Sequence, residues 1–157
     1  MEPSFEKLLV ILAEAGVRFI VVGGVAVTLQ GYVRLTEDVD LLLDSAPENI
    51  ANLLKTLGNY GEGFARELST EDFTEEEGAV RIVEEVEQCQ IDLFTLMSGL
   101  RYSDVIDAAD RHTIGKYAIP YASKAHLIGW KERSVREKDH FDAMALRQLS
   151  ANPQAFD

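Results

Sequence analysis

Apolar residues follow two different spacings in the N-terminal third of the chain. Residues 3–15 carry them at helical spacing, whereas VRFIVVG (17–23) and DVDLLLD (38–44) are short aliphatic runs typical of buried strands. The pattern predicts a helix over 3–15 that ends at Gly16, a strand over 17–23, a turn at Gly23 and Gly24, a short helix or turn over 25–31, a strand over 38–44, and a helix from Pro47 to about Leu57.

The rest of the chain alternates between strand-like and helix-like segments. The acidic stretch 69–78 is interpreted as a solvated loop or hairpin connection. The pattern predicts strands over 64–68, 79–87 and 89–95, a helix over 103–110 capped by Ser103, an extended hairpin over 112–122, a helix capped by Ser123 that runs towards Arg133, a last helix from about Glu137 to Leu149, and a frayed tail after Asn152.

This order of elements indicates an α+β (α/β-like) fold with a mixed β-sheet flanked by helices. We expect a single domain over 1–157, with a core over about 1–100 and C-terminal helices over about 101–150 packed on it. Hydrophobic residues make up 46% of the chain, which is enough to build a core.

Charge and cysteine content narrow the classes of partner. The formal net charge of −12 repels a phosphate backbone over most of the surface, which argues against broad nucleic-acid binding. A local basic patch is still compatible with a nucleotide or one RNA end. A single cysteine, Cys89, favours a reducing cytoplasm and is expected to be a small buried side chain. The apolar run 8–12 is too short to span a membrane, so no membrane partner is expected.

Asp38 and Asp40 are the first candidate site residues. Residues two apart in a strand face the same side, roughly 6 to 7 Å apart at Cα, while Val39 and Leu41 face the core. Paired like charges beside a core are costly unless a cation neutralises them. Mg²⁺ prefers one or two protein carboxylates and completes its shell with phosphate oxygens and water, so the pattern favours a divalent cation site.

Two further features extend this site. The turn at Gly23 and Gly24 follows a buried strand and exposes backbone N–H groups that a phosphate can approach, although the sequence is neither a Walker loop nor GxGxxG. Asp92 is a lone acid between Ile91 and Leu93 in a predicted strand. If its strand lies beside 38–44, Asp92 shares a metal or takes a proton; the alternative is an edge-strand charge that faces solvent.

The motifs together resemble a known superfamily. Gly23-Gly24, then 13 residues, then Asp38-Val39-Asp40 and an apolar residue resemble the signature of the nucleotidyltransferases related to DNA polymerase β. The Arg-x-Thr before the acids and the segment HLIGWKERSVREKDHFDAMAL (126–146) are similar to the AbiEii-type and minimal (MNT-like) bacterial branches. In that C-terminal motif the matching positions are Lys131, Arg136, Lys138, Asp139 and Asp142.

The resemblance implies a role for each matching residue. It implies an NTP as substrate, with Mg²⁺ or Mn²⁺ held by Asp38, Asp40 and Asp92, and it assigns the catalytic role to the same three residues. Nucleotide-binding roles fall on Gly23, Gly24, Arg34, Thr36, Lys131 and Lys138. Arg34 and Thr36 either contact phosphate or fix the loop, and Lys131 either contacts the triphosphate or is a solvated lysine. The three histidines are interpreted as structural or surface residues, and Trp130 as a core residue with base stacking as the alternative.

Three hypotheses follow from these features. The first is a metal-dependent nucleotidyltransferase that moves a nucleoside monophosphate from an NTP to a hydroxyl of a tRNA end, a protein or a small molecule. The second gives the same chemistry a toxin role restrained by an antitoxin partner, on family resemblance alone. The third is a non-catalytic nucleotide-binding or interaction protein with the same fold, for which a homodimer is one expected partner arrangement; three retained carboxylates argue against it.

Overall fold

The protein is described by a computed structural model that covers residues 1–74 and 76–151. Its strands form one mixed sheet in the order β3-β4-β2-β1-β6-β5. β1 and β2 pair antiparallel, while β2 with β4 and β1 with β6 pair parallel. The α+β class expected from the sequence is therefore confirmed. The predicted tail after Asn152 lies outside the described residues, as does Glu75 in the acidic stretch.

The N-terminal elements follow the sequence pattern closely. Helix α1 (Pro3–Glu14) ends before Gly16, whose φ of +76° is readily adopted by glycine. Strand β1 (Phe19–Val22) is buried along its whole length, as its uninterrupted apolar sequence predicts. For residues 25–31 the sequence allowed either a short helix or a turn, and the structure has helix α2 (Gly23–Leu29) there. Strand β2 (Asp38–Leu43) follows.

The middle of the chain contains one wrong prediction. Helix α3 (Pro47–Leu57) begins at its proline as expected. Residues 64–68 are not a strand: they form the 3₁₀ helix η1 (Phe64–Glu67), followed by η2 (Thr70–Asp72). FAREL alternates apolar and polar residues over too short a length for periodicity to separate a strand from a helical turn. Strands β3 (Val80–Glu84) and β4 (Cys89–Phe94) then pair antiparallel, and Cys89 is buried.

The C-terminal part contains a second correction. The predicted helix over 103–110 is only α4 (Tyr102–Val105) followed by η3 (Ile106–Ala108), and Asp110 already belongs to β5. Ser103 is not the cap, because the Asp104 carboxylate accepts the backbone N–H of Arg101 and starts the helix one residue earlier. The remaining elements are β5 (Asp110–Ile114), β6 (Tyr117–Tyr121), α5 (Lys124–Arg133) and α6 (Glu137–Ala151).

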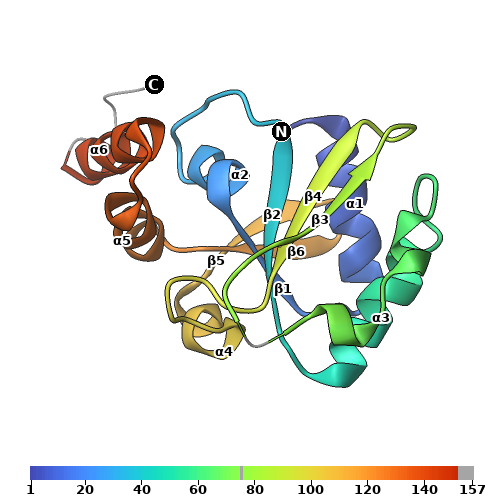
Figure 1. The fold of residues 1–157 in the computed structure, drawn as a ribbon. Coiled ribbons are helices and arrows are strands. Elements are labelled where there is room, and N and C mark those ends of the chain that lie inside the picture. Colours follow the sequence, from blue (N-terminus) through green and yellow to red (C-terminus); the bar gives the residue numbers. More distant parts are fainter. Residues whose placement is uncertain (75, 152–157) are drawn as a thin grey trace.

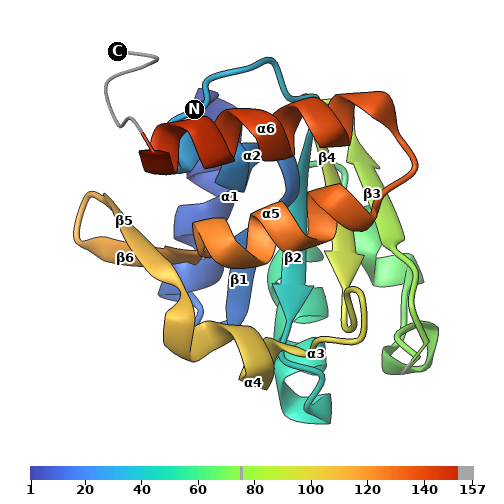
Figure 2. The ribbon, with the colours of Figure 1, turned by 90° about the vertical axis from the view of Figure 1, so that its left-hand side faces the viewer.

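Helices cover both faces of the sheet. Helices α1 and α3 lie on one face, and α2, α5 and α6 lie on the other (Figures 1 and 2). Ser123 caps α5 as predicted, since its hydroxyl accepts the backbone N–H of His126. Between residues 1–74 and 76–151, no helix is both long and apolar enough to cross a bilayer. The C-terminal helices α5 and α6 thus cover the face of the sheet on which Asp38, Asp40 and Asp92 lie.

Candidate functional site

Three carboxylates meet on the face of the sheet below α5. Strands β2 and β4 run parallel in a register that places Asp40 opposite Asp92, and Asp38 is two residues from Asp40 on the same face. One oxygen from each of Asp38, Asp40 and Asp92 lies within 4.8 Å of the others. The expected juxtaposition is therefore present, and the alternative of a solvent-facing Asp92 is wrong because that residue is only 4% exposed.

Burial and mutual repulsion make this cluster expensive without a cation. Burial, followed by the charges of Asp38 and Asp92, raises the pKa of Asp40 from 3.8 to about 8. Burial and the contact with Asp92 also raise the pKa of Asp38. The Oδ1 atom of Asp40 is buried and has no hydrogen-bond partner within 1–74 and 76–151. An orphaned carboxylate oxygen among three converging acids fits a hard divalent cation.

Arg81 is a member of the cluster that the sequence patterns did not single out. It lies on β3 opposite Asp92, and its Nε and Nη2 atoms lie 2.8 Å from Oδ1 and 3.2 Å from Oδ2 of Asp92. Burial alone would raise the pKa of Asp92, but the hydrogen bonds from Arg81 outweigh it and the pKa of Asp92 is lowered. One signal in the sequence could have identified it: Arg81 is the basic residue of the predicted strand VRIVE (80–84), which precedes the strand that carries Asp92.

The two glycines allow side chains to pack against the turn. Gly23 has a φ of +66°, and a Cβ atom there would lie 1.9 Å from Oδ2 of Asp40. At Gly24 a Cβ atom would lie 2.9 Å from Cγ2 of Thr36 and 3.0 Å from Nη2 of Arg34. The absence of side chains at both positions therefore brings Asp40 and the 34–36 segment against the start of α2.

A buried ion-pair network joins the C-terminal helices to the site. Lys131 Nζ lies 2.8 Å from Oδ1 of Asp139 and 3.1 Å from Oδ2 of Asp142. Arg34 reaches the same Asp142 oxygen at 3.0 Å, and Arg136 forms a bidentate pair with Asp139. Lys131 is 8% exposed, so its interpretation as a solvated lysine is wrong.

The network fixes the charge of Asp139. Burial alone would raise the pKa of Asp139, but hydrogen bonds from Lys131, Ser134 and Arg136 hold that pKa far below its usual range. The Asp142 contacts are ion pairs without aligned hydrogen bonds, since its Oδ2 atom has no hydrogen-bond partner among the described residues. Arg34 is therefore held in place by a carboxylate of α6.

Two cavities border the acidic cluster. The first, of about 430 Å³, is polar and is called the basic cavity here because four cationic side chains line it: Arg34, Lys131, Arg136 and Lys138. Gly24, Thr36, Asp38 and Asp40 line it as well. The second, of about 210 Å³, is called the apolar chamber after Phe94, Met97, Leu127 and Trp130 in its lining. The rest of its lining is Gly23, Ser98 and the charged residues Asp40, Lys131, Arg136 and Asp139.

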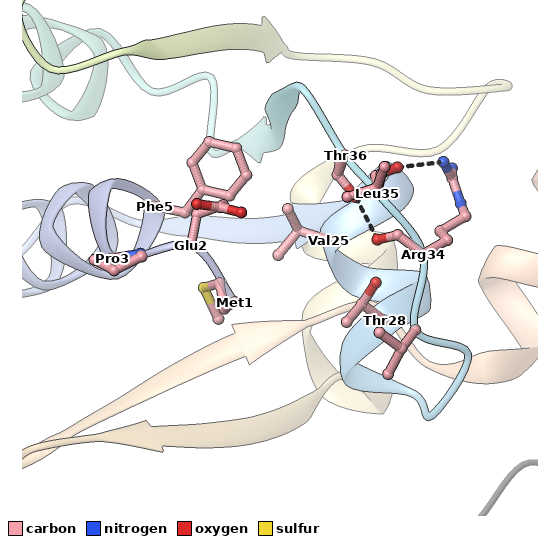
Figure 3. A pocket seen from close by; sticks show the side chains of 10 residues that line it. Met1, Glu2, Pro3, Phe5, Val25, Thr28, Arg34, Leu35 and Thr36 are labelled. Carbon is pink, nitrogen blue, oxygen red and sulfur yellow. Dashed lines mark hydrogen bonds between the residues drawn. The ribbon is translucent and has the colours of Figure 1, made fainter.

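A third cavity lies behind the 34–36 segment. It measures about 430 Å³ and is mainly apolar, between the start of α1, helix α2 and the loop before β2. Figure 3 shows Phe5 and Val25 facing this space and the Arg34 guanidinium turned away from it. Because the guanidinium is directed elsewhere, this cavity does not belong to the basic site.

All the residues singled out from the sequence gather in one region. The three acids, the two glycines and the four other candidates, Arg34, Thr36, Lys131 and Lys138, border the cluster or the basic cavity. Within 1–74 and 76–151, the only group of three or more His, Cys, Asp or Glu residues placed to hold a metal is the acidic one, so no histidine takes part. Trp130 is 9% exposed, as expected of a core residue.

Comparison with known proteins identifies the family of the chain. Residues 3–153 match the family described as "Nucleotidyl transferase of unknown function (DUF2204)". The chain belongs to this family of nucleotidyl transferases. The AbiEii-type branch expected from the C-terminal motif is not what the match identifies.

A solved structure shares the fold. The crystal structure of the lincosamide antibiotic adenylyltransferase LnuA, bound to lincomycin, is similar with a TM-score of 0.65 and 19% sequence identity. The similarity covers 95% of this chain and 98% of that chain. Among curated proteins, none matches this chain. At this identity the LnuA structure supports the fold, and its substrate is a property of LnuA.

Proposed function

We propose that the protein is a divalent-metal-dependent nucleotidyltransferase that transfers a nucleoside monophosphate from an NTP to a hydroxyl group. The observation that carries this proposal is the convergence of Asp38, Asp40 and Asp92 beside a cavity lined by four cationic side chains. Carboxylates that hold a cation next to a phosphate-binding surface are the arrangement that nucleotidyl transfer requires. Membership of a nucleotidyl transferase family supports the same class of reaction.

The acidic cluster is suited to Mg²⁺ or Mn²⁺. Asp38, Asp40 and Asp92 would hold the ion, and the orphaned Oδ1 atom of Asp40 would gain a partner. When bound, such an ion neutralises charge on the phosphates and on the attacking oxygen. Binding also removes the repulsion that raises the pKa of Asp40.

The side chains of the basic cavity bind and orient the triphosphate. Lys138 is exposed and can turn towards an anion, whereas Arg34 is held by Asp142 and both Lys131 and Arg136 are held by Asp139. The backbone N–H groups of Gly23 and Gly24 approach a phosphate without obstruction by a Cβ atom. Thr36 packs against Gly24 and keeps the 34–36 segment at the cavity wall.

The reaction breaks one bond and forms another at the α-phosphorus. The acceptor oxygen bonds to the α-phosphorus as the bond from that phosphorus to the β-phosphate oxygen breaks, and pyrophosphate leaves with the electron pair. The acceptor proton passes to the carboxylate of Asp92 or through it to water. Arg81 lowers the pKa of Asp92, so this carboxylate is ionised and ready to accept at neutral pH.

The choice of acceptor is a separate matter. A tRNA end, a protein side chain and a small molecule all offer a hydroxyl, and a toxin restrained by an antitoxin would use the same chemistry. The net charge of −12 disfavours long RNA and so favours a small molecule or a protein. LnuA, which shares the fold, was solved with a small molecule, lincomycin.

The transfer itself tests the proposal. Purified protein is incubated with each NTP, Mg²⁺ and a panel of alcohols, and pyrophosphate release and mass gain of the acceptor are measured. We expect both signals with wild type and neither with Asp40→Asn, whose side chain keeps the shape but not the charge. Asp44→Asn, which changes an acid paired with Arg18 next to the same strand, is the matched control and should remain active. Undiminished transfer by Asp40→Asn would refute the assignment.

A further inference from the structure

The apolar chamber is the part of the site that triphosphate chemistry does not explain. It touches β2 only at Asp40 and extends along β4 beyond Asp92, to Phe94 and Met97. The basic cavity instead borders the N-terminal end of β2, at Asp38 and the residues before it. The two cavities therefore lie towards opposite ends of the acidic cluster and share Asp40, Lys131 and Arg136.

An unpaired donor lies at the wall of the chamber. The indole Nε1 of Trp130 is buried and has no hydrogen-bond partner in the described part of the chain, although the residue is only 9% exposed. A buried N–H without a partner is destabilising. The ring is held by His126, which stacks on it at 5.7 Å between centroids. The chamber therefore has a buried indole in its wall, and its lining combines Phe94, Met97 and Leu127 with the charged side chains of Asp40, Lys131, Arg136 and Asp139.

The rim of the chamber contains a second unusual feature. Ser98 has a φ of +47° in the tight turn between Met97 and Leu100, a conformation that favours glycine. Gly99 supplies the other positive φ of this turn. A serine at the strained position places a hydroxyl at the rim, where Ser98 lines the chamber.

From these features we infer that the apolar chamber is the acceptor site, and that it takes a small, uncharged or cationic cyclic alcohol. This inference rests on the proposed function. In nucleotidyl transfer the incoming hydroxyl and the leaving pyrophosphate stand roughly in line on opposite sides of the α-phosphorus. With pyrophosphate among the cations of the basic cavity, the hydroxyl enters from the opposite end, which is the chamber.

Size and charge define the class of acceptor. A volume of about 210 Å³ equals that of about seven water molecules, enough for one substituted ring. Phe94, Met97, Leu127 and the indole of Trp130 offer apolar and aromatic contact to the ring. The acidic cluster and the net charge of −12 repel an anionic acceptor such as an RNA end.

Trp130 is the only tryptophan of the chain, so its fluorescence reports directly on the chamber. The probes are an aminocyclohexanol, cyclohexylmethanol, glycerol phosphate and the trinucleotide cytidine-cytidine-adenosine, each titrated with Mg²⁺ and a non-hydrolysable ATP analogue present. We expect a saturable change in emission with the first two probes and none with the two anionic probes. Met97→Phe, which narrows the chamber, should weaken the response about tenfold, and Val33→Phe in the separate third cavity should leave it unchanged.

A second variant separates binding from structure. Trp130→Phe replaces the indole by a smaller phenyl ring; where transfer to a cyclic alcohol is measured, its KM for the alcohol should rise about tenfold while its KM for Mg–ATP stays within about twofold. Its melting temperature should fall by a few degrees, because the phenyl ring fills less of the buried space than the indole. A lower melting temperature with an unchanged KM would show that Trp130 is only structural.

The remaining outcomes separate the two proposals. Binding of the ATP analogue without a response to any alcohol would overturn the acceptor assignment and leave the proposed function standing. A response to the trinucleotide alone would overturn the acceptor class in favour of RNA. No binding of a non-hydrolysable analogue of any of the four NTPs would refute the proposed function whatever the alcohols do.

Discussion

Replacing Asp40 by asparagine removes a negative charge that the metal-free fold must accommodate. Burial, together with the charges of Asp38 and Asp92, raises the pKa of Asp40 from 3.8 to about 8. At about 1.36 kcal/mol for each unit of pKa, keeping this carboxylate ionised costs about 6 kcal/mol. Because neighbouring side chains and water relax around the charge, we expect Asp40→Asn to gain about 2 to 3 kcal/mol of unfolding free energy at pH 8 without metal.

The pH dependence gives the sign of this effect. The folded protein binds more protons than the unfolded chain between about pH 4 and pH 8, because the folded pKa of Asp40 is the higher one. Stability from the protonated carboxyl is therefore fully present below about pH 4 and is lost as the pH rises through about 8. The wild type should lose stability across this window, and Asp40→Asn should lose much less.

The assay is urea unfolding in a metal chelator, followed by circular dichroism at several pH values. Asp44→Asn is the control, since Arg18 lowers the pKa of Asp44 despite the opposing effect of burial. The free energy of unfolding of this variant should fall by up to about 1 kcal/mol, where that of Asp40→Asn should rise. Adding Mg²⁺ should stabilise the wild type more at pH 8 than at pH 5, and should have little effect on Asp40→Asn. An Asp40→Asn protein less stable than wild type at pH 8 would refute the electrostatic reasoning.

Three other substitutions test the surrounding geometry. Gly23→Ala should lower the free energy of unfolding by about 2 kcal/mol and remove most of the Mg²⁺ affinity measured by titration, since its Cβ would lie 1.9 Å from Asp40 Oδ2. The control Gly16→Ala has a similar φ but open space around the Cβ, so it should lower the free energy of unfolding by only about 1 kcal/mol and leave the Mg²⁺ affinity unchanged. Arg81→Gln should bind Mg²⁺ about threefold to tenfold more tightly by calorimetry, because a competing cation leaves the cluster; weaker binding would contradict this. Lys131→Met should lose about 3 kcal/mol in urea unfolding, since it leaves two buried carboxylates without their lysine; an unchanged midpoint would contradict the ion-pair network.

The sequence predicted the parts of the site that follow from local spacing. Asp38 and Asp40 had to share a face because they are two apart in a strand. Placing Asp92 beside them required the pairing of β2 with β4, which the sequence suggests only through a lone acid in an apolar strand. The glycine turn was recognised, but its tight packing against Asp40 depends on the register of β1 and β2.

The interactions that were missed join elements far apart in the chain. Arg81 pairs with Asp92 only because β3 folds back onto β4, and Arg34 pairs with Asp142 only because α6 lies against the loop that leads into β2. Such pairs leave no periodic signal in the sequence. The wrong strand over 64–68 has a local cause instead: a segment this short fits both an extended strand and a 3₁₀ turn.

The most direct test of the central claim is thermal unfolding with each NTP, with and without Mg²⁺, for wild type, Asp40→Asn and Asp44→Asn. A ligand at about a hundred times its Kd adds roughly 2.7 kcal/mol, a shift of several degrees in a domain of this size. We predict a Mg²⁺-dependent shift with at least one NTP for wild type and Asp44→Asn, and none for Asp40→Asn. No shift with any NTP, or an equal shift in Asp40→Asn, would contradict a metal–nucleotide site at the three aspartates.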